Sequence, residues 1–272
     1  MMKFVKGLKW VVAAGCIIAV FSGVSQCRAE EWPEIRSKIE KQYGGFDDKV
    51  KDMTIIQEGK MMAGQNEMTS EMKGFQKGDK YRLETKMAIP QKEGAGQKMP
   101  AMETTIIYDG KDGWMISPFG GKSKIPADKE ARHSTGMDWF DFIPEDANVE
   151  GTEEMNGHSC YIVSMKKSAT LPYTKMWIDK DELVLVRAEG AMPGGKKVSW
   201  VFSDFQKVAG KYKLPYRVEA SVDGKTMSIF TVKSMEINQG LGEDLFDADK
   251  VKVQEFDMKG LMEQMMKDKE EK

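Results

Sequence analysis

The sequence predicts a mainly β protein built on a single antiparallel sheet, with helices near its two ends. Residues 81–89 alternate between apolar and charged side chains, which is the period-two pattern of a strand with one wet face. Pairs such as Asn156-Gly157 and Asp223-Gly224 recur between such runs and supply the positive φ that tight hairpins need. Helical spacing is instead clear over residues 32–43 and again beyond residue 253. Short strands with turn signals between them favour an antiparallel sheet.

The N-terminal segment is typical of a secretory signal peptide. A head with three lysines precedes an apolar run over residues 10–24, and small residues lead up to Ala29. The run is short for a spanning helix, which needs ~20 apolar residues. We therefore expect residues 1–29 to be cleaved and the mature protein to be periplasmic. Lipidation at Cys16 or Cys27 stays open as a minor alternative.

Composition narrows the function of the remaining chain. The formal net charge is −2, and the predicted signal peptide carries four of the basic residues, so the mature surface is acidic and gives no support for nucleic-acid binding. No later apolar run is long enough to span a membrane. Cys160 is the one cysteine left after cleavage, and its apolar neighbours predict a buried, inert thiol.

Each element follows from local pattern. Pro33 suits a first helical position, apolar residues then recur at helical spacing up to Tyr43, and Gly44-Gly45 ends the helix. Alternating or apolar runs predict strands over residues 81–89, 102–108, 114–116, 161–165, 175–178, 183–188, 198–205, 216–221 and 227–237. We place the main domain at residues 30–250. Residues 251–272 are predicted to form an amphipathic helix with a charged tail.

Two segments interrupt the strand pattern. Residues 90–100 combine proline, glycine and charges, which indicates an exposed loop. Residues 118–147 are too long for a structureless loop in a compact domain. They are predicted to form one or two short helices that act as a mobile lid, hinged near Gly120-Gly121 and Pro126. The apolar lid residues are Met137, Trp139, Phe140, Phe142 and Ile143.

Three stretches resemble the LolA-like lipoprotein-sorting family. Residues 108–119, with Asp109-Gly110-Lys111 before Trp114, are similar to the family's Asp-Gly-Lys hairpin, Trp strand and Asn-Pro-Phe exit. Residues 175–187 resemble a later hairpin of that family, and residues 205–215 resemble a segment common among its broader members. The likeness covers roughly residues 32–247, and the ordered set of stretches is more specific than any one of them.

The resemblance implies an unclosed β half-barrel with lid helices over its concave face. In that family the cavity holds the acyl chains of a lipoprotein on its way to the outer membrane. It implies a periplasmic carrier whose partners are lipoprotein acyl chains, or other lipid, and sorting proteins of the inner and outer membranes. A similar fold serves RseB-like envelope-stress sensors, so a sensor or adaptor that binds a protein partner stays an alternative.

One departure limits what the resemblance carries over. The carrier has an arginine just after its second strand that holds the lid. The matching position here is near Gly78, with Lys77 beside it, so that latch cannot be transferred to this chain. The extension after residue 250 also falls outside the family's core pattern.

Strand alternation selects the candidate pocket residues, although it cannot tell which face is concave. The predicted acyl-chain pocket comprises Tyr81, Leu83, Met87, Ile106, Tyr108, Trp114, Ile116, Trp200 and Phe202, under the lid residues named above. The 22 methionines suit a surface that accepts varied apolar partners, although ordinary core packing accounts for most of them.

The sequence contains few motifs that indicate an enzyme or a metal-binding protein. Nucleophile-elbow, phosphate-loop and zinc-protease patterns are missing from it. We therefore expect no catalytic residues, no cofactor and no metal site. A remote alternative is copper handling, because thioethers and thiols are soft ligands and His158 and Cys160 project to one face of a strand.

Overall fold

The computed structural model describes residues 30–63, 66–88, 101–126, 140, 143–166, 173–192 and 194–252. The predicted signal peptide lies outside these residues, as does the predicted C-terminal helix apart from residues 251 and 252. Within the described ranges, no helix is both long and apolar enough to cross a membrane.

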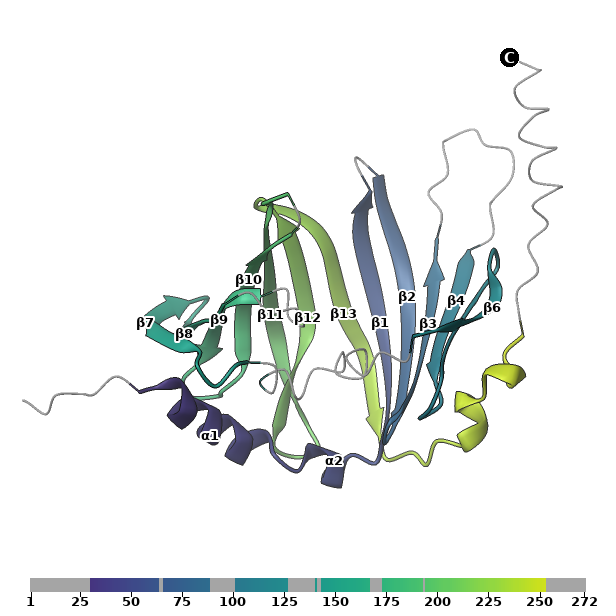
Figure 1. Cartoon of the computed structure of the whole chain (residues 1–272), viewed down its shortest axis with the longest axis horizontal. Helices are drawn as coiled ribbons and strands as arrows, with labels where there is room; N and C mark the ends of the chain where they lie inside the picture. The colour runs from purple at the N-terminus through teal and green to yellow at the C-terminus, as the bar shows by residue number, and fades with distance from the viewer. Residues whose placement is uncertain are drawn as a thin grey trace, which may run out of the picture.

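One antiparallel sheet of thirteen strands makes up most of the described chain (Figure 1). Its strands are β1 (Asp52–Ala63), β2 (Asn66–Lys77), β3 (Lys80–Met87), β4 (Met102–Tyr108), β5 (Gly113–Ser117), β6 (Gly121–Ile125), β7 (Asn148–Met155), β8 (His158–Ser164), β9 (Tyr173–Asp179), β10 (Leu185–Ala191), β11 (Lys197–Val208), β12 (Tyr212–Val222) and β13 (Lys225–Ile237). The order across the sheet is β6-β5-β4-β3-β2-β1-β13-β12-β11-β10-β9-β8-β7. The end strands β6 and β7 do not pair with each other in this sheet, so the predicted unclosed, mainly β architecture is confirmed.

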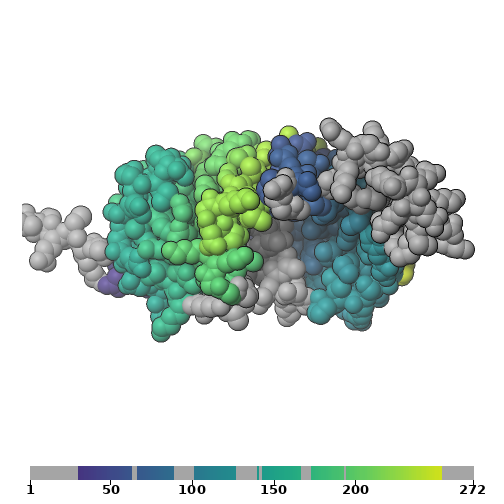
Figure 2. Space-filling view, turned by 90° about the horizontal axis from the view of Figure 1, so that it is seen from above, coloured from purple at the N-terminus to yellow at the C-terminus, as the bar shows by residue number. Residues whose placement is uncertain are grey.

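The strand order divides the sheet into two meanders that meet at its centre. β1–β6 and β7–β13 each run through neighbouring strands, and β1 pairs with β13 where they meet, with Met53 opposite Ile237. We call this pairing the central seam. Figure 2 shows the two meanders as the two sides of the molecule, blue to teal on one side and teal to yellow-green on the other.

The predicted turn pairs form the hairpins. Asn156 and Gly157 have φ of 52° and 82°, and Asp223 and Gly224 have φ of 48° and 78°. Two successive positive φ values are the signature of the turn that matches strand twist in two-residue hairpins. These pairs therefore connect β7 to β8 and β12 to β13 with tight reversals.

Helix α1 (Trp32–Tyr43) confirms the predicted N-terminal helix, and a short helix α2 (Phe46–Lys49) follows it. The backbone N–H of Glu31 donates to the Glu34 carboxylate at 3.3 Å, which stabilises the helix start. The buried residues of α1 are Trp32, Ile35, Ile39 and Tyr43, the four predicted from spacing. Both helices run along the lower ends of the β7–β13 meander (Figure 1).

The main core lies between α1 and the β7–β12 strands. Ile178 is a register partner of Tyr161 and of Leu185, so the three side chains share one face of the sheet. The Tyr161 hydroxyl donates to Glu30 at 3.0 Å, just before α1, which places the helix on this face. Ile35, Ile39 and Ile178 are fully buried in the resulting cluster.

A second, smaller core covers the opposite face of the β2–β5 strands. Residues 239–251, which include the 3-10 helices η3 (Glu243–Phe246) and η4 (Ala248–Lys250), cross these strands, and we call them the outer strap. Phe246 is 1% exposed and belongs to a buried cluster with Phe75, Ile107 and Ile116. The Lys77 ammonium donates to the Leu241 carbonyl at 2.6 Å and pairs with the Glu243 carboxylate at 2.8 Å.

The predicted lid boundaries are wrong at their N-terminal end. Residues 121–125 form β6, which pairs with β5, and residues 118–120 are the turn between the two strands. Gly121 has φ of 59°, so Gly120-Gly121 builds a hairpin rather than a hinge between sheet and lid. Residues 127–139, 141 and 142 lie outside the described residues, and so do the lid residues Met137, Trp139 and Phe142.

Candidate functional site

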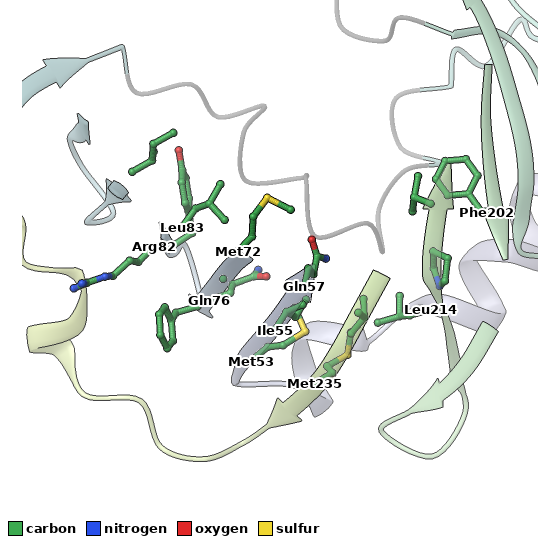
Figure 3. A pocket seen from close by; sticks show the side chains of 17 residues that line it. Met53, Ile55, Gln57, Met72, Gln76, Arg82, Leu83, Phe202, Leu214 and Met235 are labelled. Carbon is green, nitrogen blue, oxygen red and sulfur yellow. The ribbon is translucent and has the colours of Figure 1, made fainter. Parts of the chain in front are cut away.

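A cavity of about 450 Å³ lies against one face of the sheet, and both meanders line it. The lining residues are Met53, Ile55, Gln57, Met72, Gly74, Phe75, Gln76, Tyr81, Arg82, Leu83, Ile106, Phe202, Leu214, Pro215, Val218, Val232 and Met235. Leu83 on β3 and Phe202 on β11 lie far apart in the strand order, yet they border the same space (Figure 3). The sheet therefore curves around the cavity, and this face is the concave one.

Strand register explains why these side chains meet. Ile55 on β1 is opposite Gly74 on β2 and opposite Met235 on β13. Gly74 is in turn opposite Leu83 on β3. Register partners share a face, so one row of residues crosses four strands and forms a continuous wall.

The wall is apolar and rich in methionine. Met53, Met72 and Met235 line the cavity itself. Two further pairs lie on the same face beyond it, Met61 opposite Met68 and Met87 opposite Met102. Methionine side chains are flexible and polarisable, so they adapt to apolar ligands of different shape. The volume lies within the ~300–1,000 Å³ that ligand pockets commonly occupy.

Gly74 leaves a space in the wall because it has no side chain. A Cβ atom built at Gly74 meets no heavy atom within 4 Å, and its φ is not positive. The space above it is bounded by Ile55 and Leu83, its partners on the two neighbouring strands. A side chain placed at this position would project into the cavity without straining the backbone.

The polar content of the wall is small. Figure 3 shows Gln57 and Gln76 extending into the pocket, whereas Arg82 points away from it. The Arg82 guanidinium donates to the Leu245 carbonyl of the outer strap at 3.0 Å and pairs with Glu84 at 2.5 Å. Arg82 therefore contributes to the opposite face, and the cavity keeps its apolar character.

The structure brings together four of the nine predicted pocket residues. Tyr81, Leu83, Ile106 and Phe202 line the cavity. Three others share the concave face without lining it. Tyr108 is opposite Tyr81, with the two rings stacked 5.8 Å apart, Met87 lies further along β3, and Trp200 alternates with Phe202 on β11 and contacts Tyr173 edge-on at 4.7 Å.

Trp114 and Ile116 do not line the cavity, because both side chains lie on the opposite face of the sheet. Trp114 is the register partner of Ile107, whose neighbour Ile106 faces the cavity. Ile116 and Trp114 instead pack with Phe246 under the outer strap. Ile116 is buried and Trp114 is partly buried, but alternation does not identify the concave side.

Two described lid residues belong to the main core. Phe140 and Ile143 are 7% and 1% exposed and pack in the cluster that contains α1. The Arg36 guanidinium donates to the Ile143 carbonyl at 3.2 Å, which ties this segment to α1. Neither residue lines the cavity. Whether the lid moves stays a prediction.

Several wall residues were missed because no strand was predicted over residues 52–77. Met53, Ile55 and Gln57 alternate with Thr54 and Ile56, so an apolar side chain falls on both faces of β1. Such a pattern gives no period-two contrast between the two faces of the strand.

The face bearing His158 and Cys160 holds a separate, more polar cavity of about 350 Å³, bordered by His158, Ser203, Phe205 and Lys213 among others. His158 Nδ1 lies 2.8 Å from a carboxylate oxygen of Asp179, whose other oxygen accepts the backbone N–H of Asp181 at 2.9 Å. Among the described residues no His, Cys, Asp and Glu cluster could hold a metal ion.

Cys160 is a core residue. It is fully buried, and burial raises the pKa of its thiol to about 12, with nearby carboxylates such as Asp179 adding to the effect. A thiol with so high a pKa is neither nucleophilic nor a ready metal ligand at neutral pH. The prediction that Cys160 is buried is confirmed.

Three solved structures have a fold similar to that of this chain. A proposed outer membrane lipoprotein-sorting protein domain from Vibrio parahaemolyticus is 16% identical, with a TM-score of 0.54 over 79% of this chain and 96% of that one. A LolA superfamily protein from Nitrosomonas europaea is 14% identical, with a TM-score of 0.54 over 82% and 100%. A DUF1329 family protein from Desulfovibrio piger is 15% identical, with a TM-score of 0.53 over 80% and 96%.

At these identities the comparison establishes the fold and leaves activity open. The LolA-like half-barrel that the sequence resemblance implied is confirmed as the architecture of this chain. A family model described as an uncharacterized protein matches residues 143–252. No curated protein matches the chain.

Proposed function

We propose that this protein is a periplasmic, non-enzymatic carrier that binds the acyl chains of lipoproteins and moves them toward the outer membrane. The observation that carries the proposal is the apolar cavity of about 450 Å³ on the concave face of an open sheet. The predicted signal peptide and the likeness to lipoprotein-sorting structures support the location and the cargo.

The affinity of such a pocket comes from apolar transfer. Each buried methylene of an acyl chain contributes about 0.8 kcal/mol. A carrier must also release its cargo, so an adaptable wall suits it better than a close-packed one. Met53, Met72 and Met235 provide that adaptability in three neighbouring strands.

Gly74 offers a direct test. Replacing Gly74 with Leu fills the space between Ile55 and Leu83, and the backbone there accepts a side chain. We expect Gly74→Leu to weaken the binding of an anthroyloxy-labelled stearic acid roughly tenfold, because about two methylenes lose their place in the pocket. The measurement is a fluorescence titration of the purified protein.

Glu71→Leu is the matched control, because Glu71 lies on the same strand but is exposed. This variant should bind the probe as the unmodified protein does, and circular dichroism should show the same fold for all three proteins. Equal affinity of the Gly74→Leu variant would contradict the proposed pocket. Co-purification with a non-lipidated regulatory protein, and with no acylated protein, would favour the sensor alternative.

A further inference from the structure

The cavity wall carries two carboxamides in a mostly apolar surface. Gln57 lies on β1 and Gln76 on β2, and both line the cavity. Arg82 also borders it, but its guanidinium is held by Leu245 and Glu84 on the opposite face. Gln57, Gln76 and the Tyr81 hydroxyl are thus the neutral groups of the described wall that can both donate and accept hydrogen bonds.

The Gln76 carboxamide is incompletely satisfied. Its oxygen Oε1 is shielded from solvent and has no hydrogen-bond partner among the described residues. A buried acceptor without a donor is costly, because it has lost its hydrogen bonds to water and gained none in exchange. A hydrogen-bond donor on a bound ligand would satisfy this oxygen.

Strand register places both carboxamides beside the free space at Gly74. Gln76 is two residues from Gly74 on the same face of β2. Gln57 is opposite Met72, which is two residues from Gly74 in the other direction. Figure 3 shows the two side chains extending into the same region of the pocket. A ligand segment lying over Gly74 therefore passes between them.

The chemistry of a carboxamide defines what this segment is. Each Gln side chain offers one acceptor oxygen and a donor NH₂ group, so its complement is a group that both donates and accepts. An amide does both through its N–H and C=O, whereas an ester only accepts and a hydrocarbon does neither. A carboxylate also only accepts, so a fatty acid binds through its chain and leaves the Gln76 oxygen unpaired.

We infer that the ligand of this cavity is an N-acyl amide, in which the chain is joined to the rest of the molecule through an amide group bound between Gln57 and Gln76. The inference rests on the acyl-chain binding proposed above and specifies the linkage that the site prefers. Gln57 and Gln76 act as specificity-determining residues, and the apolar wall supplies the affinity.

Three probes of equal chain length test the linkage. N-Methyldodecanamide, methyl dodecanoate and dodecanol are each titrated against the labelled stearic acid bound to the unmodified protein. We expect the amide to compete about tenfold more strongly than the ester, because the ester leaves the acceptor oxygen unpaired. Dodecanol should fall below the amide, since its donor and acceptor share one oxygen atom, whereas the N–H and C=O of the amide point in opposite directions toward the two carboxamides.

Gln76→Leu removes the acceptor while keeping the side chain similar in size. In this variant the preference for the amide over the ester should fall to about twofold or less, and binding of the ester should be retained. Gln57→Leu should lower the same preference and serves as the independent variant if the first is poorly folded. Gln206→Leu, at an exposed glutamine outside the cavity, should keep the full preference.

The outcomes separate the linkage from the function. If the labelled stearic acid does not bind the unmodified protein, acyl-chain binding itself is wrong. If it binds but amide and ester compete equally, or dodecanol competes best, the amide linkage is wrong and acyl-chain binding stands. A preference for the amide that survives in both Gln76→Leu and Gln57→Leu would overturn the roles of these two residues.

Discussion

Two glycines on the concave face stand in opposite surroundings. A Cβ atom at Gly74 would meet nothing within 4 Å. A Cβ atom at Gly59 would lie 2.4 Å from the Ser70 hydroxyl oxygen and 2.8 Å from the Phe230 ring. Gly59 is opposite Phe230 across the central seam and opposite Ser70 on β2. One glycine leaves room for a ligand, and the other leaves room for the ring that closes the seam.

The two positions should respond oppositely to the same substitution. We expect Gly59→Ala to lower the free energy of unfolding by about 1–3 kcal/mol, because the added methyl overpacks the seam. Gly74→Ala should raise it by about 0.5–1 kcal/mol, since alanine loses less backbone entropy than glycine on folding. Urea unfolding monitored by circular dichroism measures both.

A double variant identifies the cause at Gly59. Ser70→Ala removes the closest contact, so Gly59→Ala should cost less in that background than in the unmodified protein. Additive costs of the two substitutions would show that Ser70 is not the residue that the methyl displaces.

At the scale of single residues, the sequence predicted which side chains are covered better than it predicted which face of the sheet they lie on. Trp114, Ile116 and Tyr108 were all expected to be covered, and Tyr108 and Ile116 are each 4% exposed. Only the register of β4 and β5 shows that Trp114 and Ile116 face the outer strap. The strap comes from residues 239–251, and their position over a strand some hundred residues earlier is a tertiary fact that no local pattern contains.

Among the elements, the outer strap is fixed by charge as well as by Phe246. The Glu243 carboxylate pairs with Lys77 at 2.8 Å and also with Lys80. These two ammonium groups lower the pKa of Glu243 to about 2. Lys122 pairs with Asp249 near the other end of the strap. Lys77 therefore lies on the convex face. It is next to the position, near Gly78, that matches the lid-holding arginine of the carrier.

The strap should therefore loosen in acid. A lowered carboxyl pKa contributes stability that is complete above the ordinary value of 4.5 and is lost as pH falls toward about 2. Glu243→Gln should lower the melting temperature at pH 7, and the difference from the unmodified protein should shrink as pH falls below 4.5. Because Glu243 is exposed, added salt should reduce the difference as well.

Glu71→Gln supplies the control, since Glu71 is an exposed carboxylate on β2 away from the strap. It should leave the melting temperature nearly unchanged across the same pH range. A Glu243→Gln difference that is constant from pH 7 to pH 2 would show that the pairing with Lys77 and Lys80 does not act through the carboxylate charge.

Elements with strong local signals were predicted well. The β4 strand was expected over residues 102–108 and has these bounds, and α1 has the four predicted buried residues. The strand β1 was missed because apolar residues lie on both of its faces, and β2 was missed because Ser70, Gly74 and Gln76 interrupt the apolar residues of its concave face. β6 was missed because its sequence, Gly121-Lys122-Ser123-Lys124-Ile125, lies in a short hairpin at the sheet edge, where packing imposes little hydrophobic pattern.

For the molecule as a whole, burial is unevenly shared between the two meanders. The main cluster draws on strands β8–β12 and on α1, with Val163, Met176 and Val186 each at most 1% exposed. The cluster under the strap contains five buried residues among the described ones. The β3–β6 side of the pocket therefore has less apolar burial behind it than the opposite side.

Hydrogen exchange should reveal this asymmetry. We expect backbone amides of residues 102–125 to exchange faster than those of residues 158–166 and 173–191, because local opening costs less where fewer apolar contacts break. Mass spectrometry of peptides after timed deuterium labelling measures both regions in one experiment. Equal protection of the two regions would mean that the sheet opens as a single cooperative unit.

The central seam also bears on how the chain reaches this structure. Within each meander, neighbouring strands are close in sequence and can pair soon after they are made. β1 and β13 cannot, because Met53 and its partner Ile237 lie near opposite ends of the described chain. Contacts of such high sequence separation carry a large loop-closure entropy and slow folding. Until the last strand arrives, β1 is left with an unpaired backbone edge, so a chaperone that shields it in the nascent chain would protect the molecule from aggregation.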